Sequence, residues 1–251
     1  MAATHELKNQ IVIVTGSSSG IGAATAELIA AEGAVVVLVA RRAERLTQLA
    51  ARIAQAGGRA SAIAADVTEI AECRRVAQAV FAQHGRVDIL VNAAGIVRPN
   101  SVEEAPSEEF KEQVDINLLA PMYMSHEVLP GMRARGAGHI VVVSSTAARR
   151  VGVRHSAYVA SKHGVNAFSE ALRQEVAPFG VRVTVIDPGA TETEVYDSIP
   201  NAKDREVMYA HVNKAGVVKA AEIGDAIVYA LKQPPHVNIR EIWIAPTSAV
   251  A

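Results

Sequence analysis

The stretch "TGSSSGIG" at residues 15–22 joins a short apolar run, "IVIVT" at 11–15, to the helix-like stretch "AATAELIAAEG". Gly16 allows a sharp turn, Gly20 lets the backbone approach a pyrophosphate, and Gly22 lets helix and strand pack closely. The start of the helix then offers free N–H groups and a positive dipole to phosphate. Glycines are common between strands and helices, but this strand and this helix supply the context of a dinucleotide-binding turn. The predicted cofactor-binding residues of the turn are Gly16, Ser18, Ser19, Gly20, Ile21 and Gly22.

Outward from this turn, short β-branched runs alternate with longer amphipathic stretches. This alternation predicts right-handed βαβ units on a parallel sheet that helices cover on both faces. No linker rich in Pro, Gly or Ser interrupts it. We therefore predict an α/β protein with a single Rossmann-fold domain over residues 1–251, built on a doubly wound, parallel, seven-stranded sheet. The predicted strands are 11–15, 35–39, 60–64, 88–91, 139–144, 181–187 and 239–244, and the predicted helices are 20–32, 43–56, 69–84, 107–135, 156–177 and 220–232.

Residues 188–219 break this rhythm, because they mix turn residues with a weak helical pattern and show no strand signal. Loops of this length in compact domains are usually lids or disordered segments. The segment follows the carboxyl end of a predicted strand, which is where ligands bind in open α/β sheets. We predict a substrate lid, and a tolerated surface insertion is the alternative.

Composition excludes several classes of protein. Apolar residues make up 50% of the 251 residues and charged residues 20%, typical of a soluble globular protein. The apolar runs are about five residues long, against the roughly 20 that a membrane span needs. The N-terminal "MAATHELKNQ" is polar and resembles no export signal, so we expect a cytoplasmic protein that contacts no membrane.

The net charge and the spacing of possible metal ligands exclude further classes of protein. The formal net charge is −1 and no basic cluster exceeds two residues, which argues against a nucleic-acid partner. Eight histidines are scattered without metal-ligand spacing, so no metal site is expected. The single cysteine, Cys73, lies at helical spacing with apolar residues, which predicts a core position rather than a reactive thiol.

The second predicted strand ends in "VVLVARRAERL", and this ending bears on which dinucleotide binds. A carboxylate about 20 residues past a glycine turn bonds the adenosine ribose 2′-hydroxyl, whereas arginine accepts a 2′-phosphate. Ala40 stands where an acid would stand, and Arg41 and Arg42 follow it. The alternative is that both arginines are solvated residues opening a helix, although positive charge is mildly unfavourable there. We predict NADP(H) as the cofactor.

The segment "SAYVASKHG" at 156–164 places Tyr158 and Lys162 four residues apart, on one face of a predicted helix. Reduction of a carbonyl by hydride needs a proton donor that cycles between acid and base. Free tyrosine has a pKa near 10, and a neighbouring ammonium lowers it by favouring the phenolate. In most proteins a Tyr and a Lys at this spacing have no catalytic role, but in this chain a dinucleotide-binding turn precedes them. We predict a catalytic pair with a tyrosine pKa near 7.

The glycine spacing GxxxGxG, then Asn92-Ala93-Ala94-Gly95, then Tyr158-x-x-x-Lys162 resembles the short-chain dehydrogenase/reductase family over about residues 7–246. Three further segments resemble a narrower branch of the family, which holds NADP-dependent 3-hydroxy acid dehydrogenases and clavulanic acid dehydrogenase. These segments are "PMYMSHEVLPGM", "GVNAFSEALRQEV" and "REIWIAPT".

The resemblance implies roles for individual residues. The catalytic tetrad would be Asn117, Ser145, Tyr158 and Lys162: Ser145 binds the carbonyl, with Ser144 as the alternative, and Asn117 bends its helix and binds a water that links the lysine to solvent. Asp66 would bond the adenine amino group with Val67 beside it, although Asp66 could also be a helix N-cap. The other residues that the resemblance places at the cofactor are Asn92, Ala93, Gly95, Tyr158, Lys162, Pro188, Gly189, Thr191 and Thr193; an ordinary turn is the alternative for the last four.

The expected function is interconversion of a small carbonyl compound and its alcohol. Arg149 and Arg154, with Arg150 between them, could bind a substrate carboxylate, face solvent or meet a neighbouring subunit. A non-catalytic NADP-sensing module is the alternative function, but the chain retains every catalytic position. An epimerase or dehydratase with tightly held NAD would usually carry an acidic residue after the second strand, and none is present. Family members are mostly tetramers, so a homotetramer or a homodimer is expected.

Overall fold

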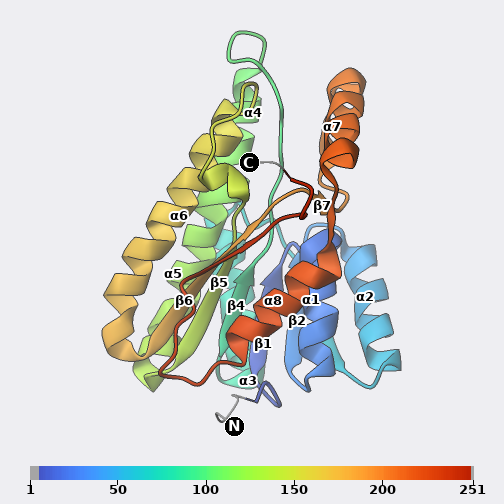
Figure 1. Cartoon of the computed structure of the whole chain (residues 1–251). Helices are drawn as coiled ribbons and strands as arrows, with labels where there is room; N and C mark the ends of the chain where they lie inside the picture. The colour runs from blue at the N-terminus through green and yellow to red at the C-terminus, as the bar shows by residue number, and fades with distance from the viewer. Residues whose placement is uncertain (1–5, 250–251) are drawn as a thin grey trace.

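Seven parallel strands form one sheet in the computed structural model, which describes residues 6–249 of the chain (Figure 1). The strand order is β3-β2-β1-β4-β5-β6-β9, and each neighbouring pair is parallel. The predicted fold class is therefore confirmed. The strands are β1 (Ile11–Thr15), β2 (Val35–Ala40), β3 (Arg59–Ala64), β4 (Ile89–Asn92), β5 (Gly138–Val143), β6 (Val181–Pro188) and β9 (Glu241–Ile244).

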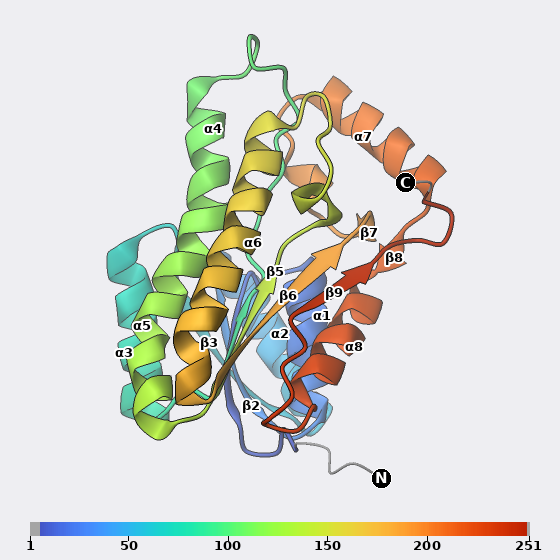
Figure 2. The ribbon, with the colours of Figure 1, turned by 60° about the vertical axis from the view of Figure 1, so that its left-hand side comes forward.

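Helices cover both faces of the sheet (Figures 1 and 2). The strand β1 has the sequence IVIVT and is buried at all of its positions. Its run of consecutive apolar residues is explained by the helices, which cover both faces of the sheet. Two hydrophobic clusters, one on each face, form the core. One face carries α1 (Gly20–Ala31), α2 (Ala43–Gln55) and α8 (Ala220–Leu231), and the other carries α3 (Ile70–His84), α5 (Ala120–Arg135) and α6 (Ser156–Val176).

The sheet reverses its winding between β1 and β4, which lie side by side although two strands and three helices separate them in sequence. Open α/β sheets bind ligands outside the carboxyl ends of their strands at such a switch point. The glycine-rich turn leaves β1 at this edge, and residues 93–95 leave β4 beside it. The topology therefore brings together two motifs that the sequence keeps some 70 residues apart.

The predicted helix 107–135 is continuous but not uniform. It begins as α4 (Ser107–Val114), passes through the π-helical segment η1 (Asp115–Leu119), and continues as α5. A π-turn inserts an extra residue per turn and is frequent at functional sites.

Segment 188–219 differs from the sequence-based expectation. We expected no strand there, yet β7 (Thr191–Glu192) pairs with β8 (Val218–Lys219) at its two ends. Strands of two residues are too short to produce an alternating pattern. Between them lies α7 (Ala202–Ala215), whose first turn is capped by the Asn201 side chain, and which projects beyond the sheet edge (Figures 1 and 2).

Within residues 6–249, no helix combines the length and apolar character needed to cross a bilayer. The cytoplasmic location stays a prediction. The same described residues contain no group of three or more His, Cys, Asp or Glu side chains placed to hold a metal ion. Cys73 is fully buried in α3 and its thiol contacts the carbonyl oxygen of Val67, which confirms its core position.

Candidate active site

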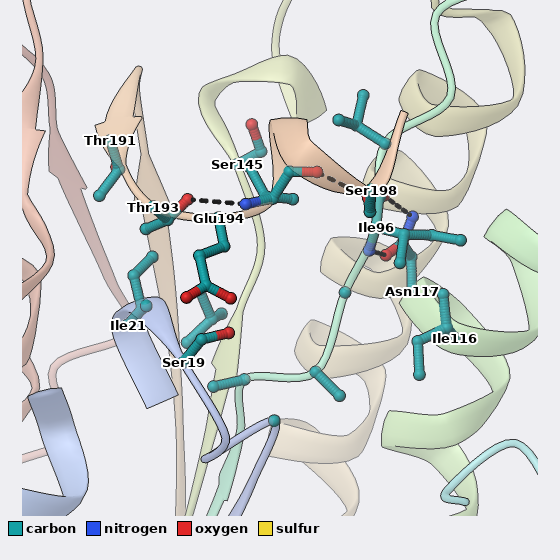
Figure 3. Close-up of a pocket in the computed structure, with 18 of the residues that line it drawn as sticks. Ser19, Ile21, Ile96, Ile116, Asn117, Ser145, Thr191, Thr193, Glu194 and Ser198 are labelled. Atoms are coloured by element: carbon teal, nitrogen blue, oxygen red, sulfur yellow. Dashed lines mark hydrogen bonds between the residues drawn. The ribbon is translucent and has the colours of Figure 1, made fainter. Parts of the chain in front are cut away.

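A cavity of about 510 Å3 opens where the strands end, between the glycine-rich turn and segment 188–219 (Figure 3). Two of the predicted cofactor residues, Gly22 and Asn92, are not among its lining residues, and neither of the two predicted substrate arginines is. The predicted residues that do line it are Gly16, Ser18, Ser19, Gly20, Ile21, Arg41, Arg42, Asp66, Val67, Ala93, Gly95, Asn117, Ser145, Tyr158, Lys162, Pro188, Gly189, Thr191 and Thr193.

Gly16 and Gly22 show most directly why the glycine-rich turn needs glycine. Gly16 has a φ of +66°, and a Cβ there would lie 2.6 Å from the backbone nitrogen of Ala94. A Cβ on Gly22 would lie 2.5 Å from the carbonyl oxygen of Gly16. These contacts press the turn against the end of β4 and against the first turn of α1. The glycines therefore hold the start of α1 close to the end of β4, at the mouth of the cavity, where free backbone N–H groups of a helix N-terminus suit a phosphate.

Asn117 lies within the π-helical segment, where the helix departs from regular α-helical hydrogen bonding; the bend expected at this residue stays a prediction. Its Oδ1 accepts from the backbone nitrogen of Ile96 at 3.0 Å, and its Nδ2 donates to Ile96 O at 3.0 Å and to Ser161 Oγ at 3.2 Å (Figure 3). A Cβ on Gly95 would lie 3.0 Å from Asn117 Oδ1 and 3.7 Å from Lys162 Nζ. Asn117 thus ties the loop after β4 to α6 beside the lysine.

Tyr158 and Lys162 share one face of α6, as their spacing predicted. The Lys162 side chain is buried, and its Nζ donates to the carbonyl oxygen of Val143 at 3.1 Å. The same Nζ lies 5.8 Å from the centre of the Tyr158 ring. The ammonium is therefore held by the end of β5 rather than by the phenol.

Ser145 is better placed than Ser144 to act with the tyrosine. The Ser145 side chain lies close enough to Tyr158 to lower the pKa of the phenol, and the Ser145 backbone nitrogen donates to Asp187 Oδ1 at 3.2 Å. The Ser144 hydroxyl instead points towards the backbone of α6, 3.5 Å from the Lys162 carbonyl oxygen. Asp187 was not foreseen from the sequence. It is fully buried beneath Ser145 and also accepts from Asn166.

The expected tyrosine pKa near 7 is wrong for the site as the structure shows it. Burial raises the pKa of Tyr158 to about 12, and the hydrogen bond with Ser145 opposes this only in part. Burial also lowers the pKa of Lys162 to about 8, against the attraction of Asp187. The spacing of four residues predicted the shared face, but it could not predict that desolvation outweighs the field of the ammonium.

At the other end of the cavity, Arg42 lies against the glycine-rich turn. Its guanidinium donates to Ser18 Oγ at 2.8 and 3.1 Å and to Ser19 Oγ at 2.7 Å. Arg41 is more exposed and lies 3.8 Å from Asp66 Oδ2. Asp66 accepts from the backbone and the hydroxyl of Thr68, as a turn-capping aspartate does. Guanidiniums and hydroxyls in this arrangement suit a phosphate.

Two further residues at this end were not identified from the sequence. Arg45, one turn further along α2, and Glu194, from segment 188–219, form an ion pair that also includes Arg42. The position of Arg45 one helical turn past Arg41 and Arg42 was a usable signal. No sequence pattern could have placed Glu194, because its neighbours here are about 150 residues away in the chain.

Both predicted substrate arginines are engaged elsewhere. Arg149 pairs with Glu241 and lies over the ring of Trp243, 5.3 Å from its centre. Arg154 pairs with Glu104 at 3.4 Å and with Asp204 of α7 at 2.9 Å. The structure therefore does not bring either guanidinium to Tyr158, and the carboxylate-binding role stays a prediction.

The space beside Tyr158 is lined mainly by apolar groups. The wall comes from the loop after β4, from the short helix η2 (Thr146–Ala148) and from segment 188–219. Lining side chains of the cavity that the sequence did not single out include Ile96, Val97, Ala147, His155, Val195, Tyr196, Met208 and Val212. This end of the cavity suits a small organic molecule with a polar group directed at Tyr158 and Ser145.

Known sequences similar to this chain are oxidoreductases. The model of the short chain dehydrogenase family matches residues 10–204. An uncharacterized oxidoreductase of Staphylococcus saprophyticus is 34% identical over 245 residues, covering 96% of this chain and 99% of its own. Glycine betaine reductase ATRR of Emericella nidulans is 37% identical over 242 residues, or 96% of this chain, but the match spans only 19% of that longer protein.

Two solved structures similar to this chain contain NADP or a hydroxylated form of it. A metagenomic short-chain oxidoreductase in complex with NADP is 30% identical, has a TM-score of 0.83, and covers 97% of this chain and 99% of its own. An alcohol dehydrogenase from the archaeon Thermococcus sibiricus, complexed with 5-hydroxy-NADP, is 27% identical with a TM-score of 0.87, over 97% of this chain and 99% of its own. The resemblance to the narrower branch is not tested by these matches and stays a prediction. The chain belongs to the short-chain dehydrogenase/reductase family, whose members are oxidoreductases that use a nicotinamide cofactor.

Proposed function

We propose that this protein is an NADP(H)-dependent oxidoreductase that interconverts a small aldehyde, ketone or oxo acid and its alcohol by hydride transfer. The observation that carries the proposal is the convergence of Tyr158, Lys162, Ser145 and Asn117 on the cavity that the glycine-rich turn also lines. A nicotinamide cofactor bound in this cavity supplies or accepts the hydride.

The proton chemistry belongs to the chain's own residues. Ser145 holds the carbonyl oxygen, and Tyr158 Oη donates a proton to that oxygen as the carbonyl is reduced. A raised pKa keeps the Tyr158 phenol protonated at neutral pH, which is the form that reduction consumes. The Lys162 ammonium stabilises the phenolate that remains after the transfer. Asn117 holds the loop after β4 in the position that this arrangement requires.

The cofactor's contacts follow from the lining of the cavity. The backbone N–H groups of residues 16–21 would hold the pyrophosphate, and Arg41 and Arg42 would bind the 2′-phosphate of NADP(H). The NADP and 5-hydroxy-NADP complexes of the two similar structures support this choice. By family resemblance, Asp66 and Val67 would bind adenine, Asn92 would tie the ribose to β4 from beneath the cavity wall that Ala93 and Gly95 line, and Pro188, Gly189, Thr191 and Thr193 would bind the carboxamide.

A test of the function is a panel of aldehydes, cyclic ketones and keto acids, each acid paired with its methyl ester, assayed by loss of NADPH or NADH absorbance. We expect turnover with NADPH at least about tenfold more efficient than with NADH. Arg149 and Arg154 lie in ion pairs outside the cavity, so equal efficiency with each acid and its ester would exclude the carboxylate-binding role predicted for them. A protein that binds NADPH but turns over no substrate in either direction would support the non-catalytic alternative.

A homotetramer or homodimer is part of the proposal. Trp243 on the edge strand β9 is 53% exposed, which suits a contact with a second copy of the chain. Light scattering on the purified protein measures the assembly directly, and a monomer at working concentration would contradict this part of the proposal.

A further inference from the structure

Glu194 reaches from the start of segment 188–219 across the mouth of the cavity to α2. Its Oε1 and Oε2 lie 2.5 and 2.6 Å from Arg45 Nη1, and its Oε2 lies 3.1 Å from Arg42 Nη1. Figure 3 shows the Glu194 side chain pointing into the pocket, towards Ser19. One carboxylate therefore bridges two guanidiniums beside the glycine-rich turn.

The groups around this carboxylate form an anion-binding set. Arg42 contributes Nη1 to Glu194, and its Nε and Nη2 contact the hydroxyls of Ser18 and Ser19. Arg45 adds a second guanidinium. All the side chains of this set except Glu194 can donate hydrogen bonds to an anion, and Glu194 only accepts them. The carboxylate lies where Nη1 of Arg42 and Nη1 of Arg45 meet, beside the two serines that Arg42 also contacts.

The positive charge of the two arginines exceeds the negative charge of Glu194, so this site favours an anion of higher charge. Two guanidiniums face a single carboxylate, which carries one negative charge and two oxygens. A phosphate monoester carries a charge of about −1.5 to −2 at neutral pH and three acceptor oxygens. It can therefore engage both arginines bidentately, where the carboxylate leaves a net positive charge.

Exposure leaves this arrangement free to change. The side chains of Arg42, Arg45 and Glu194 are 46%, 44% and 42% exposed. Ion pairs this exposed contribute little to folding stability, so the fold does not depend on the bridge. An anion arriving from solvent can replace the carboxylate without unfolding any element of the sheet.

We propose that the Glu194 carboxylate occupies the binding site of the cofactor's 2′-phosphate and that the phosphate displaces it. Arg45 then binds the phosphate together with Arg42. This inference rests on the proposed preference for NADP(H). NAD(H) has a hydroxyl at the same position and cannot displace a carboxylate from two arginines. Displacement also detaches the start of segment 188–219 from α2, which couples the arrival of NADP(H) to the segment that borders the substrate space.

The test uses two nucleotide probes that differ only in the 2′-phosphate, 2′,5′-ADP and 5′-AMP, with calorimetric titration of the full-length protein. Glu194→Gln keeps the side chain's shape and removes its charge. We expect it to bind 2′,5′-ADP about three- to tenfold more tightly than wild type, with 5′-AMP changed less than about twofold. Glu192→Gln, on an exposed glutamate of the same segment, is the matched control and should change neither affinity.

Arg45→Ala tests the second half of the proposal. We expect it to weaken 2′,5′-ADP by about tenfold and to leave 5′-AMP unchanged, since a charge-assisted contact to phosphate is lost. Hydrogen exchange of the backbone amides at 195–199 adds a readout of displacement. In wild type the exchange should rise with 2′,5′-ADP but not with 5′-AMP, and in Glu194→Gln it should be high with either.

The outcomes separate this inference from the proposed function. If wild type prefers 2′,5′-ADP but Glu194→Gln binds it no more tightly, or Arg45→Ala binds it equally well, the displacement is refuted and the NADP(H) preference stands. Unchanged exchange at 195–199 in wild type refutes the displacement as well. If wild type binds both probes equally, the NADP(H) preference and this inference fall together.

Discussion

The two ends of the cavity are held by different kinds of contact. At the tyrosine end, Lys162 and Asn117 are buried and bond to backbone atoms of Val143 and Ile96. At the arginine end, Arg42 and Glu194 are nearly half exposed and bond to other side chains. Backbone contacts in the core fix a geometry, whereas exposed side-chain pairs rearrange when a competing charge arrives. We therefore expect changes at the tyrosine end to alter turnover, and changes at the arginine end to alter the choice of cofactor.

The largest effect at the tyrosine end, apart from loss of the tyrosine itself, is expected from Lys162→Met. We expect kcat to fall at least about a hundredfold, because the support for the phenolate is lost. The same change should stabilise the fold. The pKa of Lys162 lies near 8 in the folded protein, below its ordinary 10.5, so at pH 7 the buried charge opposes folding. Removing it, less the bond to Val143, should raise the free energy of unfolding by about 2 kcal/mol.

Urea unfolding at pH 7 measures this gain. Lys232→Met, which removes a half-exposed ammonium paired with Glu32, is the control and should gain no stability and retain kcat. A Lys162→Met protein that is less stable than wild type would show that the buried ammonium is better compensated than its contacts indicate.

At the arginine end, Arg42→Ala should change affinity rather than chemistry. Loss of the charged contacts should raise the Kd for NADPH about 10- to 100-fold, with the Kd for NADH changed less than about twofold. Arg52→Ala is a matched control, since Arg52 is an exposed arginine of the same helix paired with Glu27, away from the cavity. Fluorescence titration with both cofactors measures the effect. Equal weakening of NADH and NADPH binding would show that the arginine end of the cavity does not determine the choice of cofactor.

Asp187, beneath Ser145, should produce a smaller effect, seen in the pH dependence of stability. Burial, with the adjacent Glu241 carboxylate, raises the pKa of Asp187 to about 7. The folded state therefore binds more protons than the unfolded state between about pH 4 and 7, and this contribution to stability is lost as the pH rises through 7. Wild type should lose stability between pH 5 and 8, and Asp187→Asn, which has no proton to lose, should not.

Urea unfolding at the two pH values tests this, with Asp225→Asn, on an exposed residue of α8, as the control that should behave like wild type. If Asp187→Asn keeps the same pH dependence as wild type, another group carries it, and the buried carboxyl is ionised throughout this range.

The sequence predicted those parts of the molecule that depend on local patterns. The glycine-rich turn, the alternating elements and the shared face of Tyr158 and Lys162 each follow from residues close together in the chain. The pKa of Tyr158 was predicted with the wrong sign because the degree of burial depends on packing between distant elements. The short strands β7 and β8 escaped notice because two residues make no pattern.

Long-range ion pairs also could not be predicted from the sequence. Arg149 has its partner 92 residues away and Arg154 has one 50 residues away, so neither could be recognised as engaged. Glu194 gave no signal for the same reason. Its approach to Arg42 and Arg45 depends on how segment 188–219 folds back over α2.

The measurement that most directly tests the account is a comparison of Tyr158→Phe with wild type, in which the Kd for NADPH and the rate of a single turnover are measured on the same preparations. The account predicts a rate about a thousandfold lower, because the proton donor is gone. It predicts a Kd changed by no more than about fivefold, because only one hydrogen-bonding hydroxyl is removed. A variant that turns over like wild type would contradict the role of Tyr158 as proton donor.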